Sequence, residues 1–348
     1  MLFRSPRENY LIAVYGGKPQ WVPDFWEDVN MLNFNKYEMV PTEDGLMKDY
    51  FDITYMGNMP AKHKFWEDIS DWRKYSFPDL TKIDWEVEAE WFKQIIDPTK
   101  LIRLDLGNHG LFLTLANALG FMDALIALME DEEEVIAFLR AYTDYMKLCI
   151  DYAAKYIKPD LIAICEDTSN ARGPFISKET YRKIFRPFMQ ELCDYAHTYN
   201  FAFDIHNCGD PQYLFDEYLD MGVNVVNACN YSEYLVDFRK RTGAKLCVEG
   251  GWDSQGPAGL PNAPEEVVRQ SVRDCYDRFA ADGGYVTLGN GIVVGGDMQA
   301  MKQKVNWCQE EANSIRFEYY GKKTAEELEK LSAYTHGMDG MWKVMQIE

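Results

Sequence analysis

From about residue 100, the chain alternates short apolar stretches with long helical patterns, and this alternation limits the possible folds more than any other feature. Strands that alternate with helices pair in parallel, because each helix returns the chain to the same end of the sheet. The sequence predicts strands at 102–106, 161–165, 201–206, 223–227, 245–249 and 285–288. It predicts helices at 131–156, 178–199, 212–221, 264–281 and 297–315.

Two earlier stretches, 21–26 and 50–56, could supply two more strands. Eight β/α units in 348 residues indicate an α/β fold of the TIM (β/α)8 barrel type, in which functional residues lie at the carboxyl ends of the strands. We therefore expect one barrel domain over residues 1–315. Within it, 57–100 carries four tryptophans among many charges and is expected to form an insertion, an N-terminal excursion over the barrel mouth.

The last segment, 316–348, is expected to form a C-terminal helical extension, with one helix at 325–331. This extension could pack on a neighbouring copy in a homodimer.

Composition excludes several classes of partner. A formal net charge of −20 argues against nucleic acid and against an anionic membrane surface, because both are bound through basic patches. No apolar run approaches the roughly 18 residues that a membrane span needs. The eight cysteines include no C-x-x-C pair and indicate no disulfide framework, so a reducing cytoplasm is the expected location.

The most specific motif is His206-Asn207-Cys208-Gly209-Asp210, at the end of the third predicted strand. Side chains alternate between the two faces of a strand, so His206 and Cys208 point the same way. An imidazole and a thiolate in one small volume are half of a zinc site. A catalytic zinc needs three protein ligands and one open position. Glu249 could be the third ligand, with Cys247 on the same face as the alternative.

Carboxylates also follow the strand that ends at Cys165. Asp167 and Glu166 would lie at the same barrel end as His206, and burying them unpaired would cost several kcal/mol each. We expect both to be catalytic residues, which orient the metal ligands or a substrate hydroxyl, or act as acid and base.

A glycine-rich turn follows the last predicted strand, and its Asn290 and Gly291 are candidate cofactor-binding residues. Such a turn before a helix can bind phosphate through backbone N–H groups, although the spacing matches no nucleotide-binding motif. His109, just after strand 102–106, is the other histidine that could reach the barrel mouth, as a substrate-binding residue.

The order of these segments resembles the uroporphyrinogen decarboxylase superfamily over about residues 1–315. The stretches that carry the resemblance are Ser5-Pro6-Arg7-Glu8, Val22-Pro23, Glu166-Asp167, 175–181, Arg186-Pro187-Phe188, His206-Asn207-Cys208-Gly209-Asp210, Gly250-Gly251-Trp252-Asp253 and Gly283-Gly284-Tyr285. Within the superfamily, the chain resembles the zinc-dependent, corrinoid-linked methyltransferases. This branch implies a barrel whose mouth receives a separate corrinoid (cobalamin) protein and whose zinc activates the methyl donor or acceptor.

Two departures from known branches refine this expectation. The decarboxylases carry an Arg-rich segment near the N-terminus, whereas residues 21–27 are aromatic and acidic here. The thiol-methylating members have a zinc-ligating Cys in the last glycine-rich turn, where this chain has Asn290. A carboxylate in place of that thiolate makes zinc more Lewis-acidic and better suited to an ether oxygen.

The resulting hypothesis is methyl transfer from a methoxylated compound, such as an aromatic methyl ether, to the Co(I) corrinoid of a partner protein. Trp21, Phe25 and Trp26 would line the ring pocket. The alternatives are methyl transfer from methylcobalamin to a thiol or tetrahydrofolate, a cofactor-free decarboxylase, and a non-catalytic corrinoid- or metal-binding protein.

Overall fold

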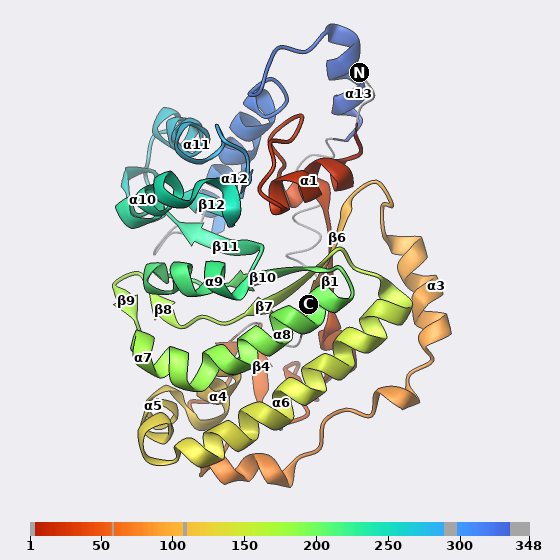
Figure 1. The fold of residues 1–348 in the computed structure, drawn as a ribbon, viewed down its shortest axis with the longest axis vertical. Helices are drawn as coiled ribbons and strands as arrows, with labels where there is room; N and C mark the ends of the chain where they lie inside the picture. Colours follow the sequence, from red (N-terminus) through yellow and green to blue (C-terminus); the bar gives the residue numbers. More distant parts are fainter. Residues whose placement is uncertain (1–3, 58, 107–109, 289–297, 335–348) are drawn as a thin grey trace.

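The computed structural model describes residues 4–57, 59–106, 110–288 and 298–334, and its centre is a curled parallel sheet (Figure 1). In spatial order the strands are β1 (Val29–Asn33), β6 (Leu101–Asp105), β7 (Leu161–Cys165), β10 (Ala202–His206), β11 (Val225–Asn230), β12 (Cys247–Trp252) and β13 (Tyr285–Val286). Each neighbouring pair is parallel. A parallel bridge from Thr287 to Asp24 joins the last strand to the segment before β1, so the sheet closes as a TIM barrel.

Helices surround this sheet. A parallel sheet with apolar strands needs them, because its residues have to be buried on both faces. The helices are α1 (Pro6–Val14), α2 (Phe25–Asp28), α3 (Trp85–Ile95), α4 (Leu111–Leu119), α5 (Phe121–Glu130), α6 (Glu132–Tyr152), α7 (Lys178–Thr180), α8 (Arg186–Thr198), α9 (Phe215–Met221), α10 (Glu233–Thr242), α11 (Glu265–Phe279), α12 (Met298–Ile315) and α13 (Ala325–Ser332). The six strands predicted after residue 100 are confirmed, with ends shifted by up to three residues.

The structure corrects the two strand predictions made for the N-terminal part. The first barrel strand is β1, and the second half of 21–26 instead forms the bridge at Asp24 and the start of α2. The stretch 50–56 supplies β4 (Thr54–Met56) to an antiparallel sheet with β2 (Met39–Pro41), β3 (Met47–Asp49) and β5 (Met59–Pro60). Both stretches are rich in aromatic residues, and such residues pack equally well in strands and in loops over a core.

Helix α1 closes the amino-terminal end of the barrel. Ser5 and Glu8 form a reciprocal capping box at its start. Its buried side chains Tyr10, Ala13 and Val14 belong to a core that includes the first residues of β6, β7, β10, β11 and β12. The α1 side chains therefore fill the amino-terminal end of the barrel interior. The carboxyl ends of the strands, at the other end, remain available for a functional site.

The insertion 57–100 packs along the outer helix α6. Trp66 is fully buried and makes an edge contact with Phe138, at 5.6 Å between ring centroids. Trp85 stacks on Tyr156 at 5.6 Å, just after the end of α6. The proposed division into a barrel of 1–315 and an extension of 316–348 stays a prediction.

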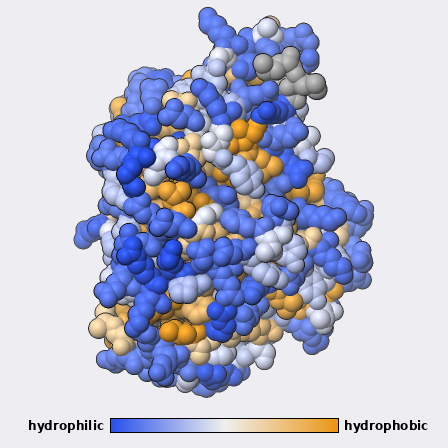
Figure 2. All heavy atoms as spheres, viewed as in Figure 1, coloured by the Kyte–Doolittle hydropathy of each residue, from blue (hydrophilic) through white to orange (hydrophobic). Residues whose placement is uncertain are grey.

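Most of the visible surface is hydrophilic, but hydrophobic side chains gather over α5 (Figure 2). Phe121, Met122, Ile126 and Met129 are all exposed there. Among the described residues, no single helix is both long and apolar enough to cross a bilayer; α4 and α5 pass that test only together, with a bend of 111° between them.

A buried ion pair connects the segment before β1, where the barrel closes, to the end of α12. The Arg316 guanidinium donates to both carboxylate oxygens of Asp28, at 2.7 and 2.9 Å, and neither side chain is exposed. The same region carries a backbone bond from Val22 N to the Arg316 carbonyl. Asp28 and Arg316 thus join the segment before β1 to the end of α12.

We expect Asp28→Asn to lower the free energy of unfolding by about 3 kcal/mol, because it leaves the guanidinium buried without its counter-charge. Urea denaturation would measure the loss. Asp237→Asn is the matched control, since Asp237 pairs with Lys240 on exposed α10 and both side chains are more than 70% exposed. Equal stability of the Asp28 variant and the control would contradict a role of the pair in closure.

Candidate functional site

The site is built at the carboxyl ends of three adjacent strands, β7, β10 and β11. Strand register pairs His206, the last residue of β10, with Cys165 on one side and with Asn227 on the other. Residues paired across parallel strands project to the same face of the sheet, so these three side chains are brought together by backbone hydrogen bonding alone.

Three potential metal ligands lie together at this point, and a fourth, Cys208, lies beside one of them. One ligand atom each from Cys165, Asp167 and His206 lies within 4.8 Å of the other two. The Cys208 sulfur lies 3.2 Å from His206 Nε2, and an Asp167 oxygen lies 3.7 Å from the same nitrogen. In a tetrahedral zinc site the ligand nitrogen and sulfur are about 3.5 Å apart, so these residues fit zinc by donor type and by spacing.

The two thiols are held in an environment that disfavours a free thiolate. Partial burial, together with the neighbouring Asp167 carboxylate, raises the pKa of Cys208 to about 12. Burial likewise raises the pKa of Cys165. A divalent cation would reverse this balance, because a coordinating thiol loses its proton.

Asp167 occupies a strained position. Its φ is +41°, in the left-handed region that non-glycine residues rarely adopt, and its carboxylate accepts a hydrogen bond from Cys208 N at 2.7 Å. Such strain costs of the order of 1–3 kcal/mol and is concentrated at functional sites. In this conformation the Asp167 carboxylate lies beside His206 and Cys208.

The other residues of the 206–210 motif fix the loop. Buried Asn207 accepts a hydrogen bond from Thr168 N at 3.0 Å and donates to Tyr218 OH at 2.8 Å. Gly209 has a φ of +81°, and an added Cβ would lie 2.5 Å from the Asn170 backbone. The loops after β7 and β10 are thereby locked together.

Glu166 points away from this cluster. Its carboxylate accepts hydrogen bonds from Leu111 N and Phe112 N, at 2.7 and 3.2 Å, at the start of α4. An added Cβ on Gly110 would meet its oxygen at 2.1 Å. Complete burial raises the pKa of Glu166 to about 8, although the two N–H donors oppose the shift.

Glu249 lies inside the barrel and is linked to His206 by two hydrogen bonds through one residue, Asn227. Its Oε2 accepts from Asn227 Nδ2 at 2.5 Å, and the Asn227 Oδ1 atom lies 2.6 Å from His206 Nδ1. Tyr10 donates to Glu249 Oε1 at 2.5 Å, and Arg103 lies 3.5 Å from Oε2. The structure thus connects Glu249 to the imidazole through Asn227 and does not group it with the thiols.

The remaining predicted site residues lie elsewhere or outside the described residues. Cys247 is fully buried in the lower barrel core. Trp21 packs on Phe317, and Phe25 lies beneath the Arg103 guanidinium. Trp26 makes an edge contact with Phe25, so a substrate-binding role for these three aromatics stays a prediction. His109, Asn290 and Gly291 lie outside the described residues.

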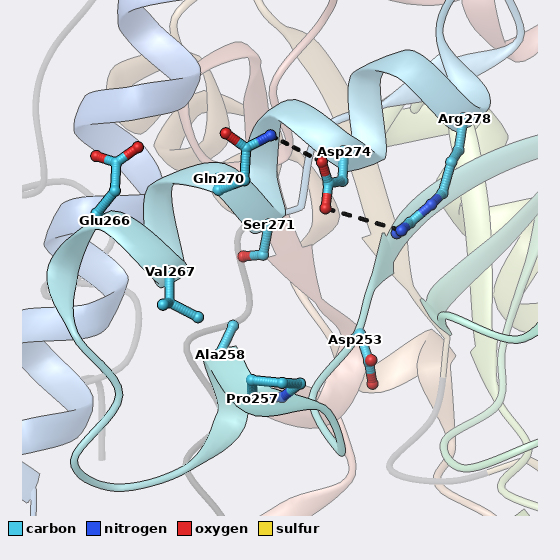
Figure 3. Close-up of a pocket in the computed structure, with 9 residues that line it drawn as sticks. All are labelled: Asp253, Pro257, Ala258, Glu266, Val267, Gln270, Ser271, Asp274 and Arg278. Carbon is cyan, nitrogen blue, oxygen red and sulfur yellow. Dashed lines mark hydrogen bonds and ion pairs between the residues drawn. The ribbon is translucent and has the colours of Figure 1, made fainter.

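A separate surface groove of about 480 Å³ lies between α11 and the loop after β12 (Figure 3). Figure 3 shows Asp274 between Gln270 and Arg278, to which it is bonded at 2.9 and 3.7 Å. The groove contains none of the four clustered ligands, and several of its charges are already paired.

Cys165 and Asn227 were not among the predicted site residues. Both were detectable in principle, because each ends or nearly ends a predicted strand next to the one that carries His206. The buried Arg103, between Ile102 and Leu104 in a predicted strand, is a further signal of an internal charge network, since Arg is almost never buried unpaired.

Comparison with known proteins agrees with this architecture. The uroporphyrinogen decarboxylase (URO-D) family model matches residues 109–311. A methyltransferase from Methanosarcina mazei has a similar fold, with a TM-score of 0.57 and 12% identity over 88% of this chain and 99% of that chain. No curated protein matches the chain. Because the family model covers more than half of the sequence, the chain belongs to the uroporphyrinogen decarboxylase family.

Proposed function

We propose that this protein is a zinc-dependent methyltransferase that moves a methyl group from a methoxylated compound, expected to be an aromatic methyl ether, to the Co(I) corrinoid of a partner protein. The observation that carries the proposal is the convergence of an imidazole, two thiols and a carboxylate at the carboxyl end of the barrel. Function in TIM barrels is located at that end.

The chemical difficulty of this reaction is the leaving group. The bond between the methyl carbon and the ether oxygen breaks, and the oxygen keeps the bonding electrons and takes up a proton. The electron pair of Co(I) forms the new bond to the methyl carbon. Bound zinc would supply Lewis-acid stabilisation of the charge that develops on the oxygen.

We assign distinct roles to the residues around this oxygen. His206 and Cys208 would hold the metal, with Cys165 or Asp167 completing the set of three ligands. The Asp167 side chain is 26% exposed beside His206, so it could also pass a proton to the leaving oxygen. Glu166 would position the start of α4, because its carboxylate accepts hydrogen bonds from two backbone N–H groups there.

Two observations support methyl transfer over decarboxylation. The fold is similar to that of a protein described as a methyltransferase. The segment 21–27 is aromatic and acidic where the decarboxylases carry arginines for the substrate's carboxylates. The corrinoid acceptor follows from the family resemblance of the 206–210 motif.

Cys165 favours one alternative, in which a thiol is the methyl acceptor. The ether reaction suits a zinc site with a single thiolate. Two sulfur atoms, those of Cys165 and Cys208, lie near His206. A second thiolate makes zinc softer and less Lewis-acidic, which suits thiol activation. The third zinc ligand therefore separates the two candidates: Asp167 favours the ether and Cys165 favours the thiol.

Zinc content would test the ligand assignment. We expect His206→Ala and Cys208→Ala to lose bound zinc in elemental analysis, because each removes a direct ligand. His63→Ala is the matched control, since the His63 side chain is exposed on the insertion and lies outside the cluster. Comparison of Cys165→Ser with Asp167→Asn then identifies the third ligand by the larger loss. Unchanged zinc in the first two variants would remove the proposed site.

Methyl transfer would be assayed with a panel of methoxyaromatics, betaines and thiols. With a reduced corrinoid protein, we expect methoxyaromatics to produce the spectral change of cobalt methylation, and His206→Ala to abolish it. Starting from the methylated corrinoid, transfer to a thiol would support the alternative. Zinc binding without turnover on any member of the panel would point to a non-catalytic protein.

A further inference from the structure

The proposed reaction requires a particular nitrogen of His206 to be free of its proton. His206 Nε2 faces the cluster, at 3.2 Å from the Cys208 sulfur and 3.7 Å from Asp167. A neutral imidazole carries one proton, and only its unprotonated nitrogen can bind a metal or accept a hydrogen bond. The partner of the other nitrogen, Nδ1, therefore decides whether Nε2 is available.

That partner is the amide of Asn227. An amide has an acceptor end and a donor end, so it could present either to His206 Nδ1. Asn227 Nδ2 lies 2.5 Å from Glu249 Oε2, and Asn227 Oδ1 lies 2.6 Å from His206 Nδ1. The orientation of this amide thus depends on whether Glu249 accepts a hydrogen bond from Asn227 or donates one to it.

Glu249 is surrounded by hydrogen-bond donors. Tyr10 donates to Oε1, and the Arg103 guanidinium lies 3.5 Å from Oε2. Burial and the Glu249 carboxylate raise the pKa of Tyr10, so the phenol keeps its proton and acts as the donor. Asp204, the other buried carboxylate here, is paired with Arg103. A carboxylate that faces Arg103 offers Asn227 only acceptor atoms.

We propose that Glu249 is a positioning residue, which acts through Asn227 to place the His206 proton on Nδ1 and so keeps Nε2 free for the metal. The role in metal binding rests on the proposed function, but the position of the His206 proton can be observed in the metal-free protein. Glu249 was predicted from sequence as a ligand, and its place behind Asn227 gives it this indirect role instead. Outer partners of this kind typically change metal affinity by 10–100-fold.

The direct test is ¹⁵N NMR of the metal-free protein with labelled histidine, which distinguishes a protonated ring nitrogen from an unprotonated one. We expect His206 to carry its proton on Nδ1. His197 is an internal control that should have the opposite proton position. Its Nε2 lies 2.9 Å from Asn224 Oδ1, and that atom is an acceptor because it also accepts a hydrogen bond from Phe203 N. His197 should therefore carry its proton on Nε2 in the same spectrum.

Variants separate positioning from a structural role. In Glu249→Gln, the new amide can present either a donor or an acceptor, so we expect mixed proton positions on His206 and a 10–100-fold weaker affinity for Zn²⁺. Tyr10→Phe leaves the Asn227 contact in place and should keep the wild-type pattern. An unchanged His197 signal would show that each variant is folded around α8 and β11.

A double variant provides the rescue. Glu249→Gln with Asn227→Asp exchanges the carboxylate and the amide. The carboxylate now at position 227 can only accept from His206, and the amide now at position 249 can donate to that carboxylate. We expect this exchange to restore the proton to Nδ1 and to recover the Zn²⁺ affinity.

Three outcomes would each overturn the inference: a wild-type proton on Nε2, an unaltered pattern in Glu249→Gln, or no rescue in a folded double variant. Absence of Zn²⁺ binding with the expected proton positions would instead refute the proposed function alone.

Discussion

The parallel pairing of β10 with β7 and β11 is the constraint on which the site depends. It aligns Cys165, His206 and Asn227 in one row across three strands. These contacts are set by backbone hydrogen bonds in the barrel wall, which is more rigid than a loop. The loops then add Asp167 and Cys208 to a row that the sheet has already fixed.

The interior of the barrel has an unusual electrostatic composition for a protein core. Arg103 is buried among the carboxylates of Asp204 and Glu249, with Asp105 at its other side. Burial raises the pKa of Asp204, while the Arg103 charge opposes that rise. A purely apolar interior would be as stable or more so. This polar layer is connected to His206 through Asn227, which bonds to Glu249 on one side and to the imidazole on the other.

Much of the barrel could be predicted from the sequence because its strands are continuous apolar runs separated by helical patterns. The six strands after residue 100 follow this rule. The N-terminal region did not, because its aromatics fill an outer core against α6 in an antiparallel sheet and in irregular turns, where periodicity carries little information. His206 and Cys208 lie together as predicted, but Cys208 follows the end of β10, so the loop places it and not the two-residue period of the strand. Glu249, like His206, faces the barrel interior, but depth along the barrel axis depends on the stagger between strands, which sequence alone does not give.

Helix α1 has a consequence for the order of events. Its side chains Tyr10, Ala13 and Val14 fill the amino-terminal end of the barrel. Within the described residues, a molecule that reaches His206 therefore approaches from the carboxyl ends of the strands. In the proposed reaction, the methoxylated compound and the corrinoid protein would both approach from that end. The small compound would then have to bind before the larger protein covers it, so the position of α1 would give the proposed reaction an ordered binding sequence.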